Sequence, residues 1–419
     1  MIKKISILAL FLILISTIFW NFINYEYQNK ILKSLLISYE KITFKESKYR
    51  KLEKKINEEN IIVSKFGNLK FKKVKLIERD SNQPLGYLEI IKDEIIYLAA
   101  NGDMYFFDKN SNQTQIKNNL NELIGNNIKL LEEELFNPYF KDSIRDLFFH
   151  KSYLYVVLLY KEMDNESVRL STAVLRGKFN KDLIEFEFFF KPDNFTKLDI
   201  DHAHIGGRVV VDDNDNFFLA VPDHDQIERI YENDNIFGKV VKIKTLKNFE
   251  IISKGHRNPQ GLFYDKKEKI LLETEHGPSG GDEINLIKKN LKYGWPTTSL
   301  GAKDDPEDPH PIYHNHLKHG FEKPLFSWRL YNPGISQIIK ISENSKFNFK
   351  ELYMVSSLSG GSMYTGNHLY IFSKKENKFI LEDKIYINDR IRDLIYDSKN
   401  DRIILALESQ ESLGIISSE

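Results

Sequence analysis

The chain has 419 residues, of which 41% are hydrophobic and 13% aromatic, enough for one large core or two ordinary ones. Its 60 basic and 60 acidic residues give a formal net charge of zero, so a long polyanion such as nucleic acid is not an expected partner. The sequence has no cysteine, which excludes disulfides, thiolate catalysis, iron–sulfur clusters and covalently attached haem.

The N-terminus has the composition of a membrane anchor. Lys3 and Lys4 precede an apolar run over residues 5–23, which is close to the length that a spanning helix needs. Aromatic residues typical of a membrane interface lie near its far end, namely Trp20, Tyr25 and Tyr27. Because no small-x-small cleavage site follows, we predict an uncleaved transmembrane signal anchor over residues 1–26 in the inner membrane, with the rest of the chain in the periplasm. The alternative is an export signal that is cleaved, which would release the chain into the periplasm.

Residues 27–62 are rich in charge and contain neither proline nor glycine. Apolar residues recur every seven positions, at Leu35, Ile42, Tyr49 and Ile56. Ser38 and Lys45 interrupt the intermediate positions of a coiled coil, so the pattern predicts a helical stalk without deciding between a coiled coil and a helix on the membrane surface.

From about residue 66 to residue 419 the pattern becomes short β-rich runs separated by turns. Residues 85–108 read as three strands, with Asn101-Gly102 as a hairpin turn. A unit of small or polar residues, an apolar strand, a charged turn and a second strand then returns near residues 144, 206, 260, 335 and 391. A β-rich unit that recurs at roughly 50 residues is typical of propeller blades, so we predict an all-β, six-bladed β-propeller whose loops gather functional residues at the central channel.

Several motifs follow one another in the second half of the chain. They are "HAHIGGRVVV" from residue 202, "GHRNPQGLFYD" from 255, "EHGPSGGDEINLI" from 275, "YGWPTTSLG" from 293, "GFEKPLFSW" from 320 and "DRIRDLIYD" from 389. In this order they resemble the soluble sugar dehydrogenases that depend on pyrroloquinoline quinone (PQQ), the glucose/sorbosone dehydrogenase family. The resemblance runs from about residue 143 to the C-terminus.

Alcohol oxidation by hydride transfer needs a base for the hydroxyl proton and an electrophile for the hydride. His204 is the natural base, because imidazole titrates near neutral pH, and the catalytic histidine of the family stands before the same Gly-Gly-Arg. Asp223 occupies the place of the acid that orients this histidine. The alternative for the pair is a structural histidine and a turn aspartate.

The resemblance assigns the remaining cofactor contacts. Arg257 matches the arginine that polarises the quinone carbonyl, and Asn258 and Gln260 lie on the same strand entry and match cofactor-binding positions. Arg390 and Arg392 alternate by two, so they face one side of a strand, and they match a cofactor-contacting pair. Their alternative is a solvated charge ladder with Asp389 and Asp393.

The stretch from residue 275 combines bent backbone, free carbonyls and carboxylates, which together suit Ca²⁺. On these residues alone, a polar turn before a strand explains the stretch equally well. By resemblance, the carbonyls of Gly277 and Pro278 reach a calcium ion that also touches the quinone and acts on it as a Lewis acid. Asp282, Glu283 and Tyr293 match residues around a nearby structural calcium site.

Two positions depart from the family pattern. Ser359 stands where the family commonly has a lysine that contacts the quinone, and Lys141 and Asp142 stand in the region of an expected glutamine. The histidine-rich stretch "HPIYHNHLKH" and the acidic stretch "DDNDN" fit no zinc or EF-hand pattern, and we interpret them as a loop and a turn.

We therefore expect a membrane-anchored dehydrogenase that depends on PQQ and calcium, oxidises a sugar or sugar-like alcohol, and passes electrons to a membrane quinone or a cytochrome. The alternative is a non-catalytic propeller that binds calcium and a carbohydrate or protein, which the serine at 359 favours. A calcium-dependent lactonase would need a different set of metal-facing acids at the channel.

Overall fold

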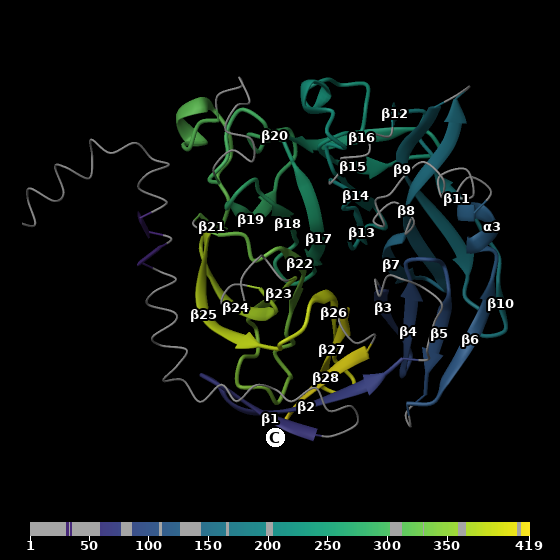
Figure 1. The fold of residues 1–419 in the computed structure, drawn as a ribbon, viewed down its shortest axis with the longest axis vertical. Coiled ribbons are helices and arrows are strands. Elements are labelled where there is room, and N and C mark those ends of the chain that lie inside the picture. Colours follow the sequence, from purple (N-terminus) through teal and green to yellow (C-terminus); the bar gives the residue numbers. More distant parts are fainter. Residues whose placement is uncertain are drawn as a thin grey trace, which may run out of the picture.

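The structure is a computed structural model, and its described residues form a ring of six sheets around a central axis (Figure 1). The described residues are 31–32, 34–35, 59–76, 86–108, 111–125, 144–164, 167–197, 204–301, 312–329, 331–358, 366–408 and 412–419.

Each blade is a mainly antiparallel sheet with one edge strand nearest the axis, and this inner strand is named first for each blade below. Blade 1 contains β3 (Gly86–Ile91), β4 (Glu94–Ala99), β5 (Met104–Phe107), β6 (Gln113–Asn118) and the parallel β10 (Leu183–Ile184). Blade 2 contains β7 (Ile144–His150), β8 (Tyr153–Asp164), β9 (Ser167–Lys178), β11 (Phe186–Phe190) and β12 (Thr196–Lys197). Blade 3 contains β13 (Arg208–Val211), β14 (Phe217–Val221), β15 (Lys239–Ile243), β16 (Phe249–Lys254) and the parallel β20 (Leu291–Lys292).

The second half of the ring repeats this arrangement. Blade 4 contains β17 (Asn258–Asp265), β18 (Ile270–His276), β19 (Asp282–Ile287) and β21 (Phe326–Trp328). Blade 5 contains β22 (Ile335–Lys340), β23 (Tyr353–Ser357), β24 (His368–Lys375) and β25 (Lys378–Tyr386). Blade 6 contains β26 (Ile391–Asp397), β27 (Arg402–Leu407), β28 (Ser412–Ser418), β2 (Gly67–Lys75) and β1 (Glu59–Ser64).

The predicted six-bladed propeller is confirmed, and the repeats near residues 144, 206, 260, 335 and 391 mark the innermost strands of blades 2 to 6. These strands and β3 contact one another in a closed cycle, β3–β7–β13–β17–β22–β26–β3. In the described part of the chain, helix is limited to the short α3 (Leu120–Gly125), the 3₁₀ turns η2 (Ile227–Arg229) and η3 (Leu317–His319), and residues 31–32 and 34–35.

The ring is closed by strands from both ends of the sequence. β2 pairs antiparallel with β28, from Leu69 opposite Ser418 to Lys75 opposite Ser412, and β1 completes the outer edge. The predicted stalk is therefore wrong for residues 59–62, because the described part of the propeller already includes Glu59–Ser64, ahead of the predicted start at 66. The run "ENIIVS" contains three consecutive β-branched residues, which favour a strand over a helix.

The core is divided among the contacts between blades. Most of the buried apolar residues of the described chain fall into six clusters, and each cluster joins two neighbouring blades. The cluster between blades 5 and 6, for example, combines Phe71 of β2, Leu369 of β24 and Leu405 of β27. No blade buries both of its faces alone, so the ring is the stable unit.

The predicted hairpins are present, including the turn at Asn101-Gly102. The stretch "DDNDN" forms the β13–β14 turn, because the Asp212 carboxylate accepts hydrogen bonds from the backbone N–H of Asn214 and Asn216. This use of Asp212 confirms the interpretation of the stretch as a turn.

The predicted anchor over residues 1–26 and most of the predicted stalk lie outside the described residues. Among the residues that the structure describes, no helix has the length and apolar character to cross a bilayer.

The ring closure predicts which N-terminal residues stabilise the propeller. Phe71 of β2 is 1% exposed and packs in the cluster between blades 5 and 6, so Phe71→Ala should lower the free energy of unfolding by about 3–5 kcal/mol. Val63 of β1 is 56% exposed, so the control Val63→Ala should change it by less than about 0.5 kcal/mol. Urea unfolding followed by tryptophan fluorescence measures both. Equal effects of the two changes would contradict the placement of β2 inside the ring.

Candidate active site

The predicted site residues gather at one mouth of the central axis. They lie just before or near the start of the inner strands β13, β17 and β26, in the β14–β15 and β18–β19 connections, at the start of β19 and directly after β20. Backbone contacts between blades hold these segments together, since the N–H of Asp223 donates to the carbonyl of Arg257 at 2.9 Å. His276 at the end of β18 contacts the carbonyl of Ile335 through Nε2, at 2.6 Å. The sequence motifs that are far apart in the chain therefore meet in space.

His204 and Asp223 form a buried pair. Nδ1 of His204 lies 2.6 Å from Oδ1 of Asp223, and Trp295 Nε1 donates to the other carboxylate oxygen at 2.6 Å. Asp223 is fully buried, so its charge acts on the imidazole with little screening. Burial by itself opposes the imidazolium, but the charge of Asp223 and its hydrogen bond outweigh burial and raise the pKa of His204 to about 9, against the opposing charge of Arg257.

The sequence "HIGGR" folds so that His204 can sit beside blade 4. A Cβ on Gly206 would lie 1.8 Å from the carbonyl oxygen of Pro259, so only glycine fits there. The N–H of Gly206 donates to Oδ1 of Asn258 at 3.0 Å, and Gln260 Nε2 donates to the same oxygen at 2.9 Å. Asn258 and Gln260 thus fix the segment that carries the histidine.

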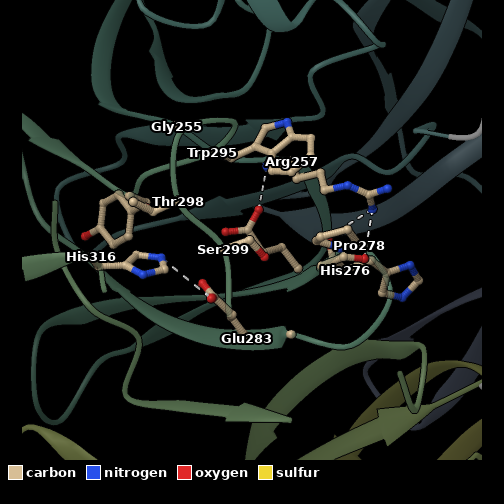
Figure 2. Close-up of a pocket in the computed structure, with 13 residues that line it drawn as sticks. Gly255, Arg257, His276, Pro278, Glu283, Trp295, Thr298, Ser299 and His316 are labelled. Atoms are coloured by element: carbon tan, nitrogen blue, oxygen red, sulfur yellow. Dashed lines mark hydrogen bonds and ion pairs between the residues drawn. The ribbon is translucent and has the colours of Figure 1, made fainter. Parts of the chain in front are cut away.

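Arg257 contacts both the Trp295 ring and the β18–β19 connection. Its Nη1 donates to the carbonyl oxygen of Gly277 at 3.0 Å, and its guanidinium lies 5.2 Å from the centre of the Trp295 ring. Its backbone N–H donates to the Glu275 carboxylate at 2.6 Å. Figure 2 shows Arg257 reaching past Trp295 toward His276 and Pro278.

Arg390 and Arg392 face the same side, as their spacing predicts. Their shared partner is Glu408, which the sequence analysis did not identify. Both donate through Nε to the two oxygens of the Glu408 carboxylate. Burial opposes ionisation of Glu408, but the charges of Arg392 and Arg390 outweigh it and lower the pKa of Glu408. The alternative is a solvated charge ladder with Asp389 and Asp393, but Asp389 is buried against Lys73 and Asp393 is buried against Arg208.

The stretch from residue 275 turns sharply between β18 and β19. Gly281 has a φ of 82°, and a Cβ there would lie 2.3 Å from the backbone nitrogen of Gly301. Asp282 is buried, and its carboxylate accepts hydrogen bonds from the N–H of Gly277, Gly334 and Ile335. This carboxylate therefore ties the β18–β19 turn to blade 5, and its assignment to a calcium site stays a prediction.

The other predicted metal residues line one small cavity of about 20 Å³, which has room for a water molecule or a single ion (Figure 2). They are Gly277, Pro278, Glu283 and Tyr293. The Gly277 carbonyl accepts from Arg257, and the Pro278 carbonyl accepts from Asn332 at 3.0 Å, which leaves a second lone pair on each oxygen. The hydroxyl of Tyr293 bonds within the β19–β20 connection instead, donating to the carbonyl of Leu286 and accepting from the N–H of Lys288.

Two further carboxylates join Glu283, and the sequence analysis did not identify them. Glu273 and Glu275 are buried on the same face of β18, and Asn285 Nδ2 donates to both, at 3.1 and 2.9 Å. Oε1 of Glu273 has no hydrogen-bond partner in the described structure. Burial, followed by the charge of Glu275, raises the pKa of both Glu273 and Glu283 well above the usual range.

Two histidines border these acids. His256 Nδ1 lies 3.5 Å from Glu275 and 3.8 Å from Glu273, and His316 Nε2 lies 3.8 Å from Glu283. Burial lowers the pKa of His316 to about 4, so its ring is neutral at pH 7. His316 belongs to the stretch that we interpreted as a loop. Its place beside Glu283 follows from its burial against blade 4, which the sequence does not indicate. The i, i+2 spacing of "ETE" in a buried strand is the signal that could have pointed to Glu273 and Glu275.

Three positions discussed in the sequence analysis, Lys141, Asp142 and Ser359, lie outside the described residues. Another residue at the mouth was missed altogether. Asp225 lies two residues after Asp223, and its Oδ1 is 3.0 Å from Nδ1 of His204.

Known proteins are similar to this chain in sequence and in fold. The chain is 31% identical over 189 residues to the aldose sugar dehydrogenase YliI of Escherichia coli, covering 41% of this chain and 50% of that protein. It is 28% identical over 204 residues to quinoprotein glucose dehydrogenase B of Acinetobacter calcoaceticus, covering 41% of this chain and 40% of that protein. The aligned segments thus span half or less of these relatives.

Solved structures agree on the fold over a longer range. The apo form of the soluble aldose sugar dehydrogenase of Escherichia coli superposes with a TM-score of 0.62 at 19% identity, covering 86% of this chain and 99% of that structure. The family model for glucose/sorbosone dehydrogenases matches residues 101–416. Because this match runs from the first blade into the last strand, β28, the chain belongs to the glucose/sorbosone dehydrogenase family of dehydrogenases.

Proposed function

We propose that the protein is a PQQ- and calcium-dependent dehydrogenase that oxidises a sugar or sugar-like alcohol. The observation that supports this most directly is the buried His204–Asp223 pair beside Arg257, because it supplies a base and a fixed cation at one mouth. The relatives named for aldose sugars and for a quinoprotein activity support the substrate and cofactor classes.

The charges at the mouth suit PQQ, which carries three carboxylates. Three guanidinium groups lie in this region, those of Arg257, Arg390 and Arg392, while Glu408 is a shared partner of the last two. Guanidinium groups bind carboxylates through paired hydrogen bonds, so these three side chains fit an anionic cofactor. When bound, PQQ supplies the electrophile that accepts the hydride.

The chain's own residues would handle the proton. Nδ1 of His204 is committed to Asp223, so Nε2 is the nitrogen left to take the substrate hydroxyl proton. Asp223 holds the ring in place, and Trp295 holds Asp223. Arg257 would orient the cofactor and stabilise negative charge that develops on its oxygen.

The small cavity suits a cation. Three buried carboxylates, Glu273, Glu275 and Glu283, lie together, and Glu273 Oε1 is left without a hydrogen bond in the described chain. Buried carboxylates in this arrangement need protons or a cation to offset their repulsion, and Ca²⁺ prefers oxygen donors. Glu275 and Glu283, together with the carbonyls of Gly277 and Pro278, would hold the ion, and the ion would supply the positive charge of a Lewis acid.

We further propose that residues 1–26 anchor the propeller in the inner membrane with its site in the periplasm, and that electrons pass to a membrane quinone or a cytochrome. The apolar run over residues 5–23 supports the anchor. A cleaved export signal would give the same compartment without the anchor.

His204→Ala should lower turnover by about 10²–10⁴-fold, the usual effect of losing a general base, while PQQ binding stays close to that of the parent. Arg257→Ala should lower both, because a guanidinium contacts the bound cofactor in the ground state as well as during the reaction. Steady-state kinetics and the absorbance of bound quinone measure the two effects. His150→Ala is the control, since His150 pairs with Asp215 on the β13–β14 turn, away from the mouth, and this variant should behave as the parent.

Unchanged turnover in His204→Ala would remove this residue from the mechanism. If the parent protein shows no turnover with saturating PQQ and calcium on a broad sugar panel, the enzyme proposal fails, and a non-catalytic carbohydrate- or protein-binding propeller becomes the better explanation.

Glu283→Gln tests the cation site. Because a ligand that binds only the folded state raises stability, Ca²⁺ should raise the melting temperature of the metal-free parent. Glu283→Gln should lose most of this increase, while the control Glu343→Gln, an exposed acid 2.7 Å from Lys267, should keep it. Differential scanning calorimetry with and without Ca²⁺ gives the comparison. An equal Ca²⁺ effect in Glu283→Gln and the parent would place the ion elsewhere.

The anchor is tested by fractionation. If residues 5–23 span the membrane, the mature protein keeps Met1 and stays with membranes after a high-salt wash, and a chain without residues 1–26 is released. Recovery of a mature chain that starts after about residue 24 would identify an export signal instead.

A further inference from the structure

His204 faces two carboxylates at the same nitrogen. Nδ1 lies 2.6 Å from Asp223 Oδ1 and 3.0 Å from Asp225 Oδ1. The two acids differ in environment, because the side chain of Asp223 is fully buried and that of Asp225 is 44% exposed. A fully buried acid with a short hydrogen bond is sufficient to fix the ring orientation, so Asp225 requires a separate explanation.

The backbone of the β14–β15 connection is bent to bring Asp225 back to the histidine. His224 and Asp225 have φ values of 47° and 56°, a region that residues other than glycine rarely occupy. The N–H of Asp225 donates to Asp223 Oδ1 at 3.0 Å, and the N–H of Gln226 donates to the carbonyl of Asp223 at 2.8 Å. The turn thus places both carboxylates against one imidazole.

Contacts of His224 with blade 2 and with its own blade 3 stabilise this turn. His224 is fully buried, its Nε2 lies 2.9 Å from Thr172 Oγ1, and its ring meets that of Phe237 edge-on at 6.0 Å. Backbone strain persists where the surrounding structure imposes it, and it concentrates at functional sites. The position of Asp225 is therefore determined by buried packing even though its carboxylate reaches solvent.

The other groups around His204 do not duplicate this role. Arg257, from the segment before β17, opposes the imidazolium with its positive charge. His276, at the end of β18, is neutral at pH 7, because burial lowers its pKa to about 3. Asp223 and Asp225 are the acids that favour the protonated ring among the described residues around it.

We propose that Asp225 is a positioning residue that stabilises protonated His204 and so sets the lower pH limit of the proposed oxidation. A base must be neutral to accept the substrate proton, so whatever favours the protonated ring moves activity to higher pH. The raised pKa of His204, about 9, agrees with this direction. Removing Asp225 should therefore lower the pKa of His204 and extend activity to lower pH.

This inference rests on the proposed function for its kinetic meaning, but its main test does not need turnover. We would follow the His204 ring by NMR in ¹³C-histidine-labelled protein without sugar, using His204→Asn to assign the signal. In Asp225→Asn the titration midpoint should fall by about one pH unit, as expected for losing one nearby opposite charge. Asp225→Glu should restore most of the difference. The exposed Asp193→Asn, whose parent residue pairs with Lys247, is the matched control and should leave the midpoint unchanged.

The kinetic test follows the acid limb of kcat/KM. In Asp225→Asn this limb should move to lower pH, giving about a tenfold higher kcat/KM on the acid side of the parent midpoint. The high-pH plateau should change little, because Nε2 and Asp223 remain in place. An unchanged NMR midpoint, or an equal loss of activity at every pH without a shift, would overturn the proposal. If no sugar is oxidised, the NMR result alone still decides the role of Asp225, separately from the proposed function.

Discussion

Pairing of β2 with β28 is the constraint on which the remaining structure depends. Each blade is covered only by its neighbours, so the six inter-blade clusters are complete only when the first and last segments of the chain meet. The buried pair of Lys73 and Asp389 lies at this junction, with Nζ 3.0 Å from the carboxylate. Because site residues come from several blades, separating the two ends would also separate the groups of the mouth.

A second buried ionic contact, that of Arg208, fixes the segment that carries His204 relative to the neighbouring blades. Arg208 Nη1 donates to Asp146 of β7 at 2.8 Å and to Asp393 of β26 at 3.0 Å. Burial raises the pKa of Asp146 to about 6, and the charge of Arg208 keeps it from rising further. Arg208 directly follows the two glycines after His204 and Ile205 and also donates to the carbonyl of Gln260. The histidine is thus tied through Arg208 to blades 2, 4 and 6.

The candidate site has guanidinium groups at its mouth and carboxylates at its cavity, although the carboxylates of Asp223, Asp225 and Glu408 also lie at the mouth. The mouth presents the guanidinium groups of Arg257, Arg390 and Arg392, while buried carboxylates line the cavity behind Arg257. Figure 2 shows Glu283 and His316 on the far side of this cavity from Arg257. An anionic cofactor in front and a cation behind would satisfy both groups, and each would lower the electrostatic cost of the other.

The sequence by itself determined the blade repeat, because alternating apolar residues and turn chemistry are local, and it identified His204, Asp223 and Arg257 through motifs that share an order with a known family. Local patterns could not assign residues 59–75, whose partner β28 lies at the other end of the chain. Nor could they distinguish Asp282 from Glu283. Adjacent strand residues point to opposite faces, and only the tertiary structure turned one carboxylate toward backbone donors and the other toward the cavity. The contact between Asp225 and His204 depends on a turn that is stabilised by a buried contact with blade 2. A local sequence pattern could not predict this contact, because the contacting residue is distant in the chain.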